Sequence, residues 1–166
     1  MATDPLKDFP GYALRRASLA VMAALARRMS ELGLRPTEAT VLVVIEANPG
    51  ITQSEVGQLL DIARANMAPL AARLLERDLI VRERVDGRSQ GLSLSAAGRQ
   101  LTRKILQTMT EHEAVLMGKI PRAHHEIFLN SLHLLWEADE ATGVPRPARS
   151  RKASQRSVSK VRLVQD

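Results

Sequence analysis

Two polar segments in the first half of the chain carry side chains suited to hydrogen bonding with nucleic acid. Arg64 and Asn66 stand close together in one of them; an arginine can donate two hydrogen bonds to guanine, and an asparagine can pair with adenine. The other segment, Thr52-Gln53-Ser54-Glu55, offers hydroxyl, amide and backbone N–H groups that can meet a phosphate. This chemistry is recognition by hydrogen bonds and charge, and it needs no covalent step.

A third polar segment lies at a tight turn formed by Asp86-Gly87-Arg88. Before it, Leu79–Val85 alternates as a strand does, and after it Leu92 and Leu94 return the chain, so the sequence predicts a β-hairpin. Its basic tip is placed to reach a minor groove or the phosphate backbone beside a major groove. The residues of all three segments that we expect to contact DNA are Thr52, Gln53, Ser54, Arg64, Ala65, Asn66, Met67, Arg73, Arg84, Asp86, Arg88, Ser89 and Gln90.

Residues typical of catalytic or metal sites form no such pattern. The chain has no cysteine, which excludes disulfides, zinc–thiolate sites and thiol-based redox switching. His124 and His125 are adjacent, so their rings point to different faces of a helix, and no acid has ligand spacing to them. His112 stands between Glu111 and Glu113, which predicts a solvated helix face. We therefore expect no enzymatic activity, no catalytic residue, no metal and no cofactor.

Helices must position these segments, because apolar residues recur at helical spacing through most of the chain. Hydrophobic residues make up 45% of the chain and aromatic residues only 2%, which favours helices around an aliphatic core. Thr52 and Glu55 form a capping box for a short helix, and Ser95 caps a long one. The expected helices are Tyr12–Leu32, Pro36 to Asn48, a short one from Thr52, about Arg64–Asp78, about Ala96–Lys119 and roughly Ala123–Ala141. The expected buried residues of the Arg64 helix are Met67, Leu70, Leu74 and Leu75.

The formal net charge of +6 resides in the C-terminal segment. From Thr142 onward there are seven basic residues and one acid, so residues 1–141 are formally neutral. We expect 142–166 to be a disordered basic tail that either attracts DNA of any sequence or keeps the protein soluble. No apolar stretch reaches the roughly 18 residues of a membrane span, and the N-terminus lacks the apolar run of a signal peptide. We therefore expect a cytoplasmic protein without a membrane partner.

The predicted order of two short helices, a tight turn between them and a following hairpin is the plan of a winged helix-turn-helix. Asp86 to Ser95 resembles the wing signature of the MarR family: an Asp, any residue, an Arg, five residues, a Leu, then Ser or Thr. Pro49–Val56 and Leu74–Ile80 are also similar to that family, and the resemblance spans about 34–98. It implies a mainly α fold with a small β-hairpin wing, in which a winged helix-turn-helix lobe is joined to a helical dimerisation domain.

Two residues depart from the family pattern in the helix expected to enter the major groove. Ala63 stands where relatives carry a capping Ser or Asp, and an Ala cap costs about 0.5–2 kcal/mol of helix stability. Pro69 lies inside the helix, where it removes one backbone donor and tends to bend the rod.

The resemblance also implies how the chain is divided and how it works. We expect 1–33 to contribute a dimerisation helix, 34–96 the DNA-binding lobe, 97–141 the C-terminal dimerisation helices and 142–166 the tail. A homodimer would place two Arg64 helices in successive major grooves of a pseudo-palindromic operator, about 34 Å apart, and repress transcription.

A small-molecule effector is expected in the cleft between the dimerisation helices and the lobe, where relatives hold anionic or aromatic molecules. Arg15 and Arg16 diverge by about 100° around a helix, so one of them can point into the cleft and pair with the carboxylate of an effector. The expected effector is an aromatic acid or an acyl thioester. Leu19, Met22 and Val43 would form the apolar wall. The alternative for the two arginines is a structural or solvated pair. The alternatives for the function of the protein are a ligand-independent architectural DNA-binding protein or a winged-helix module for protein contacts.

Overall fold

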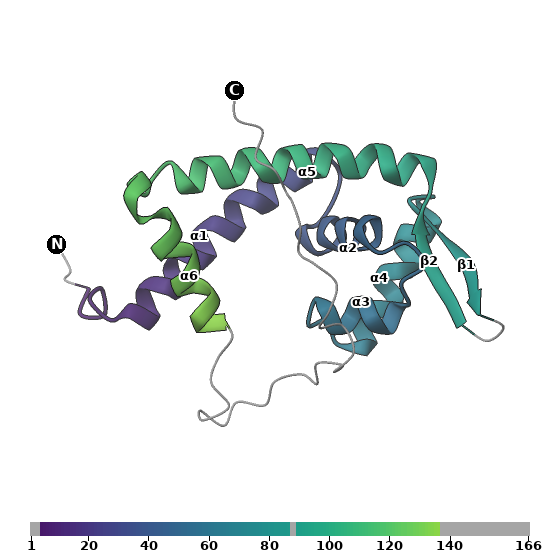
Figure 1. Cartoon of the computed structure of the whole chain (residues 1–166), viewed down its shortest axis with the longest axis horizontal. Coiled ribbons are helices and arrows are strands. Elements are labelled where there is room, and N and C mark those ends of the chain that lie inside the picture. The colour runs from purple at the N-terminus through teal and green to yellow at the C-terminus, as the bar shows by residue number, and fades with distance from the viewer. Residues whose placement is uncertain (1–3, 87–88, 137–166) are drawn as a thin grey trace.

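The computed structural model describes residues 4–86 and 89–136, which form a mainly helical protein with one two-stranded antiparallel sheet (Figure 1). The elements in chain order are α1 (Pro10–Glu31), α2 (Pro36–Ala47), α3 (Gln53–Leu59), α4 (Arg64–Glu76), β1 (Ile80–Asp86), β2 (Ser89–Leu94), α5 (Ala96–Met117), the 3-10 turn η1 (Arg122–His124) and α6 (His125–Trp136). The expected fold class, helices with a β-hairpin wing, is confirmed.

The helix α2 lies at the centre of a lobe formed by α2, α3, α4 and the hairpin. It packs against α1, α3, α5 and β2. Because its apolar residues lie on nearly every side, Val41, Leu42 and Ile45 are fully buried. The buried apolar core consists of Met29, Leu34, Ala39, Val41, Leu42, Ile45, Ile51, Val56, Met67, Leu70, Ala71, Leu74, Leu79, Ile80, Leu92, Leu94 and Ile105. The core therefore belongs to the lobe and to the parts of α1 and α5 that cover it.

Glycine at position 98 lets the first turn of α5 lie directly against the chain that enters the hairpin. A Cβ added at Gly98 would collide with the backbone carbonyl of Leu79. Ser95 holds the same contact, because its N–H donates to the Leu79 carbonyl at 3.1 Å and its hydroxyl donates to the carbonyl of Asp78. Its oxygen also accepts the Gly98 N–H at 2.9 Å, which is the predicted cap of α5.

Some helix boundaries differ from the prediction. The helix α4 ends at Glu76, because Asp78 takes a left-handed φ of 53° that stops the helix. At the other end of the chain, η1 follows Pro121, and α6 begins only at His125. Residues 137–141, which were expected to complete the last helix, and the basic tail from 142 lie outside the described residues.

The prediction of a solvated face for His112 is wrong. Its side chain is 5% exposed, and its Nε2 atom has no hydrogen-bond partner among the described residues. His112 follows Ile105 and Met109 at helical spacing on the face of α5 that packs inward, while Glu111 and Glu113 on either side are exposed. The flanking charges therefore misled the prediction, because neighbours in sequence lie about 100° apart around a helix.

The helices α1 and α6 lie at the end of α5 opposite the wing (Figure 1). Many apolar side chains of these helices, and one near the end of α5, are exposed. We call this set the outer apolar surface; its members are Phe9, Leu14, Leu19, Met22, Val115, Ile127, Leu129, Leu134 and Leu135. The most uncovered member, Leu134, is 74% exposed. Over the ranges described, none of the helices has the length and apolar character needed to cross a membrane.

Candidate nucleic-acid interface

A tight turn joins α3 to α4 and packs the two helices against each other. The Ile62 N–H donates to the Gly57 carbonyl at 2.8 Å, and Asp61 takes a left-handed φ of 52°. Gly57 is buried at this crossing, where an added Cβ would lie 3.1 Å from the Ile62 carbonyl oxygen. The small residue therefore lets α4 begin directly after the turn, and the pair has the helix-turn-helix arrangement that the sequence predicts.

The helix α4 buries one face and presents the other to solvent. Leu70 and Leu74 are buried in the core, whereas Arg64, Ala65 and Asn66 are exposed in the first turn. The guanidinium and amide groups expected to read base edges thus stand at an accessible helix start, which is the part of such a helix that enters a major groove.

Met67 was expected both to be buried and to contact DNA, and the structure supports only its burial. Its side chain is 3% exposed and packs in the core, because it lies one turn before Leu70 on the buried face. Leu75, which was expected to be buried, is half-buried. Pro69 does not interrupt α4, and Ala63 provides no side-chain cap, as its residue type predicts.

The start of α3 forms the predicted capping box. The Thr52 N–H and hydroxyl donate to the Glu55 carboxylate at 2.9 and 2.8 Å, and the Glu55 N–H donates to the Thr52 hydroxyl at 3.3 Å. The hydrogen bonds from the backbone and side chain of Thr52 lower the pKa of the Glu55 carboxyl below its usual value. Since the Thr52 side chain is engaged internally, the half-buried Gln53 and the exposed Ser54 remain the groups of this turn that can approach a phosphate.

The wing is an antiparallel pair of strands in the register Ile80↔Leu94, with an irregularity between Arg84 and Asp86. Of the residues expected at its tip, Gln90 is exposed. Arg88 and Gly87 lie outside the described residues, and only the backbone of Arg84, Asp86 and Ser89 is described. The DNA contacts expected from these side chains remain predictions.

The wing is hydrogen-bonded to the segment that leads into α3. The Gly50 N–H donates to the Leu92 carbonyl at 2.9 Å, and the Leu92 N–H donates to the Ile51 carbonyl at 2.8 Å. This isolated bridge joins β2 to the residue directly before Thr52, the cap of α3. The hairpin and the helix-turn-helix are thereby connected through backbone as well as through the core.

A buried carboxylate connects α2 with α4. Glu38 is 6% exposed; it accepts the Arg35 N–H at 2.9 Å and the Arg73 Nε–H at 3.2 Å, and Arg77 Nη1 lies 3.9 Å away. Burial alone would raise the pKa of the Glu38 carboxyl, but these hydrogen bonds and the positive charges of Arg73 and Arg77 outweigh it, so that its pKa lies below its usual value. Arg73, which was expected to contact DNA, is therefore an ion-pair partner of α2 in this structure.

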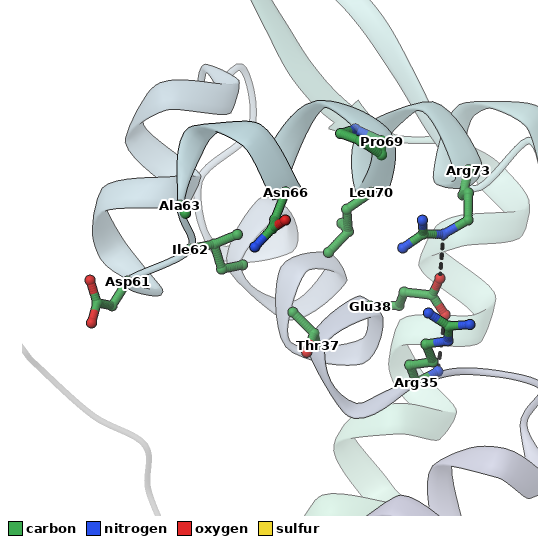
Figure 2. A pocket seen from close by; sticks show the side chains of 10 residues that line it. All are labelled: Arg35, Thr37, Glu38, Asp61, Ile62, Ala63, Asn66, Pro69, Leu70 and Arg73. Carbon is green, nitrogen blue, oxygen red and sulfur yellow. Dashed lines mark hydrogen bonds and ion pairs between the residues drawn. The ribbon is translucent and has the colours of Figure 1, made fainter.

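A groove of about 550 Å³ opens beside this ion pair, between the start of α2 and the exposed side of α4 (Figure 2). The residues that line it are Arg35, Thr37, Glu38, Asp61, Ile62, Ala63, Asn66, Pro69, Leu70 and Arg73. Figure 2 shows Arg73 reaching from α4 to the carboxylate of Glu38, with its terminal guanidinium nitrogens on the groove side. Nowhere in the described ranges do three or more His, Asp or Glu side chains gather in a way that could hold a metal ion.

Sequence reasoning did not identify the contact between Glu38 and α4. The spacing of Glu38 in the sequence could have indicated that it is buried. Glu38, Leu42 and Ile45 share one face of the helix, and that face packs in the core. An acid on a core face requires a partner, but the partner is 35 residues away along the chain and no local pattern identifies it.

The residues expected to bind an effector are only partly brought together. Arg15, Leu19 and Met22 are exposed on α1, and Val43 is half-buried on α2. Arg16 is 65% exposed; its Nη1 lies 3.2 Å from the Asp4 carboxylate, and its guanidinium lies 5.8 Å from the centre of the Tyr12 ring. The groove beside α4 contains none of these five residues.

Comparison of the sequence with known proteins finds one family and one curated relative. A model described as the MarR family matches residues 32–89. A protein of Thauera aromatica, assigned as a transcriptional regulatory protein for the hcr operon, is 27% identical over 135 residues, which cover 80% of this chain and 81% of that protein.

Comparison with solved structures finds regulators that superpose along nearly their whole length. The transcriptional repressor CouR bound to a 23-mer DNA duplex matches with a TM-score of 0.74 and 31% identity, over 82% of this chain and 98% of that one. CouR bound to p-coumaroyl-CoA matches with a TM-score of 0.73 and 28% identity, over 84% of this chain and 99% of that one. The regulator PcaV of Streptomyces coelicolor, in complex with its natural ligand, matches with a TM-score of 0.68 and 28% identity, over 83% and 99%.

Proposed function

Because this chain belongs to the MarR family of DNA-binding transcriptional regulators, we propose that it represses transcription as a homodimer on a pseudo-palindromic operator and is released by an anionic or aromatic effector. The observation that carries this proposal is the start of α4. Arg64 and Asn66 are exposed there, on a helix braced by α3 and followed by a wing. The same fold in CouR is seen with a DNA duplex bound.

The homodimer is supported by the outer apolar surface. A soluble protomer rarely leaves so many large apolar side chains of neighbouring helices in water, because burying them against a second copy is favourable. We propose that 34–96 form the DNA-binding lobe and that 1–33 and 97–141 provide the dimer contacts. Two such lobes would present their α4 helices to major grooves about 34 Å apart.

The effector is proposed from the relatives and from the arginines of α1. CouR binds p-coumaroyl-CoA, an acyl thioester that joins an aromatic group to several negative charges. Arg16 already holds a carboxylate, that of Asp4, although the pair is largely exposed and therefore weak. An effector carboxylate or phosphate would replace Asp4 at Arg16, with Leu19, Met22 and Val43 beside it. Binding there would shift the dimer toward a spacing of its lobes that does not fit the operator.

The DNA contact is tested with the promoter duplex adjacent to the protein's own gene. We expect Arg64→Ala and Asn66→Ala each to weaken specific binding by about tenfold, since each removes a base contact worth about 1–3 kcal/mol. Gln100→Ala is the matched control, because Gln100 is exposed on α5 and belongs to none of the expected contacts. Equal affinity of all three variants and the wild type would overturn the assignment of α4. Binding that does not distinguish the promoter from a scrambled duplex would favour the architectural alternative.

The effector is tested by titration calorimetry with aromatic acids and aromatic acyl-CoA thioesters. We expect an acyl-CoA or aromatic acid to bind the wild type and to release the promoter duplex, and Arg16→Ala to bind it at least about tenfold more weakly. Arg27→Ala is the control, since Arg27 is an exposed arginine on the same helix. If Arg16→Ala and Arg15→Ala both bind the compound as tightly as the wild type does, neither arginine forms the effector site.

A further inference from the structure

We propose that Glu38 is a positioning residue for DNA binding: its buried carboxylate on α2 holds Arg73 and thereby fixes the angle at which α4 meets the major groove. The inference deepens the proposed function, because it concerns the helix to which that function assigns base recognition. Glu38 itself is buried and lies on α2, and so it acts through α4.

Stability of the lobe does not by itself explain a carboxylate at this position. Moving a charge out of water is costly, and an apolar residue of similar size is often as stable as a buried ion pair. The neighbours Leu42 and Ile45 on the same face are fully buried, so an apolar side chain at 38 would continue that face. What an ion pair adds is direction, because a guanidinium bonded through its Nε–H to a carboxylate has a defined orientation.

The start of α4 lacks the devices that usually hold a helix in place. Ala63 offers no side-chain cap, and Pro69 removes the backbone donor that would bond to the preceding turn. The residues that read bases, Arg64 and Asn66, lie between these two weak points. The contact from Arg73 to Glu38 lies one turn after Pro69 and anchors the helix to α2 there.

The geometry of the groove supports the same role. Asn66, Pro69 and Arg73 lie along one side of α4 and line the groove whose opposite wall is the first turn of α2 (Figure 2). Glu38 spans this groove at one end, where Arg77 adds a second positive charge at 3.9 Å. If the Glu38–Arg73 contact is lost, α4 can tilt into or away from the groove, and the first turn of α4 moves with it.

The direction in which Glu38→Gln changes the DNA affinity distinguishes a positioning role from a purely electrostatic one. Glu38→Gln keeps the size of the side chain but removes one negative charge close to the DNA-binding helix. Coulomb attraction alone predicts that this variant binds DNA more tightly, because a repulsive charge is lost. Positioning predicts weaker binding to the promoter and little change with a scrambled duplex. The matched control is Asp61→Asn, which removes an acid from the same groove, and asparagine tolerates the left-handed φ found there.

The experiment compares full-length wild type, Glu38→Gln, Arg73→Gln, the double variant and Asp61→Asn on the promoter duplex and on a scrambled duplex, over a series of salt concentrations. We expect Glu38→Gln and Arg73→Gln each to lower the ratio of specific to non-specific affinity by about tenfold, and the double variant to be no worse than either. Asp61→Asn should leave that ratio unchanged. If Glu38→Gln binds the promoter as tightly as Asp61→Asn or more tightly, the proposal is wrong.

Amide hydrogen exchange in the free protein makes the test independent of DNA. We expect Glu38→Gln to speed exchange at residues 67 and 68 of α4 by several-fold, with core amides of α2 unchanged. Unchanged exchange throughout α4 would overturn the proposal even if DNA affinity fell. Should Glu38→Gln fail to fold, Arg73→Gln decides, because Arg73 is half-exposed and its loss leaves the core intact. If the wild type binds no promoter duplex, the proposed function fails, while the exchange experiment still decides on Glu38.

Discussion

The lobe and the outer helices contain similar apolar residues, but the lobe buries them and the outer helices expose them. In the lobe, Leu42, Ile45 and Leu74 are completely buried, and even the acid Glu38 has partners. On the outer helices, Ile127 and Leu134 of the same residue types lie largely in solvent. The difference indicates that the lobe buries its apolar residues within one chain, and it is the reason that we propose a second copy to cover α1 and α6.

The comparison also separates two kinds of constraint on the sequence. Within the lobe, a residue is constrained by contacts that this chain already makes, so its replacement changes stability directly. In the proposed homodimer, a residue of the outer apolar surface is constrained by contacts between chains, so its replacement should change association. Five changes test this division.

The largest effect is expected from placing charge on the outer apolar surface. Ile127→Glu combined with Leu134→Glu should weaken self-association by about a thousandfold or more, because two carboxylates per protomer would be buried without partners. Sedimentation equilibrium measures the mass, and circular dichroism checks that helical content is retained. Gln100→Glu, an exposed polar site on α5, is the control. A double variant that remains as dimeric as this control would contradict the proposed role of the surface.

Removing a side chain from the lobe core should have the next largest effect, and it should lower the free energy of unfolding rather than self-association. Leu74→Ala should lower the free energy of unfolding by about 2–5 kcal/mol, because it opens a cavity among fully buried neighbours. Urea denaturation measures the loss. Leu134→Ala provides the contrast, since it deletes a side chain of the same size that is 74% exposed in the protomer. A loss below about 1 kcal/mol for Leu74→Ala would mean that the lobe core is looser than its burial indicates.

At Gly98, where α5 contacts the chain that enters the wing, the structure leaves no room for a Cβ atom. Gly98→Ala should cost about 1–3 kcal/mol, because its Cβ would press on the Leu79 backbone, which cannot move aside as a side chain can. Gly11→Ala on α1 meets nothing within 4 Å and should be neutral or slightly stabilising. Thermal unfolding of both variants measures the difference. Equal melting temperatures would show that α5 can shift away from Leu79.

Within the lobe, the two helices of the helix-turn-helix should respond oppositely at their caps. Thr52→Ala should destabilise by about 0.5–2 kcal/mol, because the capping box is lost, whereas Ala63→Ser should stabilise by a similar or smaller amount. Chemical denaturation provides both values. If Ala63→Ser has no effect, the start of α4 is already held by contacts other than a cap.

The smallest effect is a pH dependence at Glu38. Its folded-state pKa lies below the ordinary value of 4.5, so its contribution to stability is present above that value and is lost as pH falls through the lower, folded-state pKa. The Glu38→Gln variant has no carboxylate at this position, so its stability lacks this contribution at every pH. The stability difference between wild type and Glu38→Gln should therefore shrink below about pH 4.5, as measured by denaturation at pH 6 and pH 3.5. A difference that stays constant would show that the carboxylate is not stabilised by its arginine partners.

Features set by adjacent residues could be predicted from the sequence, and features set by distant ones could not. The capping box at Thr52 and the cap at Ser95 each join residues within one helical turn, and the hairpin joins two strands that follow each other directly in the chain; each forms as expected. Local charge failed as a guide at His112, because the helix turns its neighbours away from it. The partner of Glu38 could not be found, since the pairing depends on how α2 and α4 pack.

For the candidate interface, residue type identified the exposed start of α4 but not the orientation of every side chain. Met67 was included because it lies in the same turn as Asn66, although helical spacing places it on the buried face. Arg73 was included for its charge, and the structure engages that charge with Glu38. A basic residue on the helix proposed to read DNA can thus serve the fold, and a buried acid within reach of it is the feature that identifies this case.

The backbone bridge between Ile51 and Leu92 has a consequence for how the protein could adapt to different operators. Since the hairpin is hydrogen-bonded to the residue preceding the α3 cap, the distance between the wing and α4 is fixed within the lobe. The distance between the DNA positions that we propose for the wing and for α4 would then be fixed as well. Operators with altered half-site geometry would have to be accommodated by rotating whole lobes about the dimer axis. Selection for a new spacing should therefore act on α1, α5 and α6, far from any base.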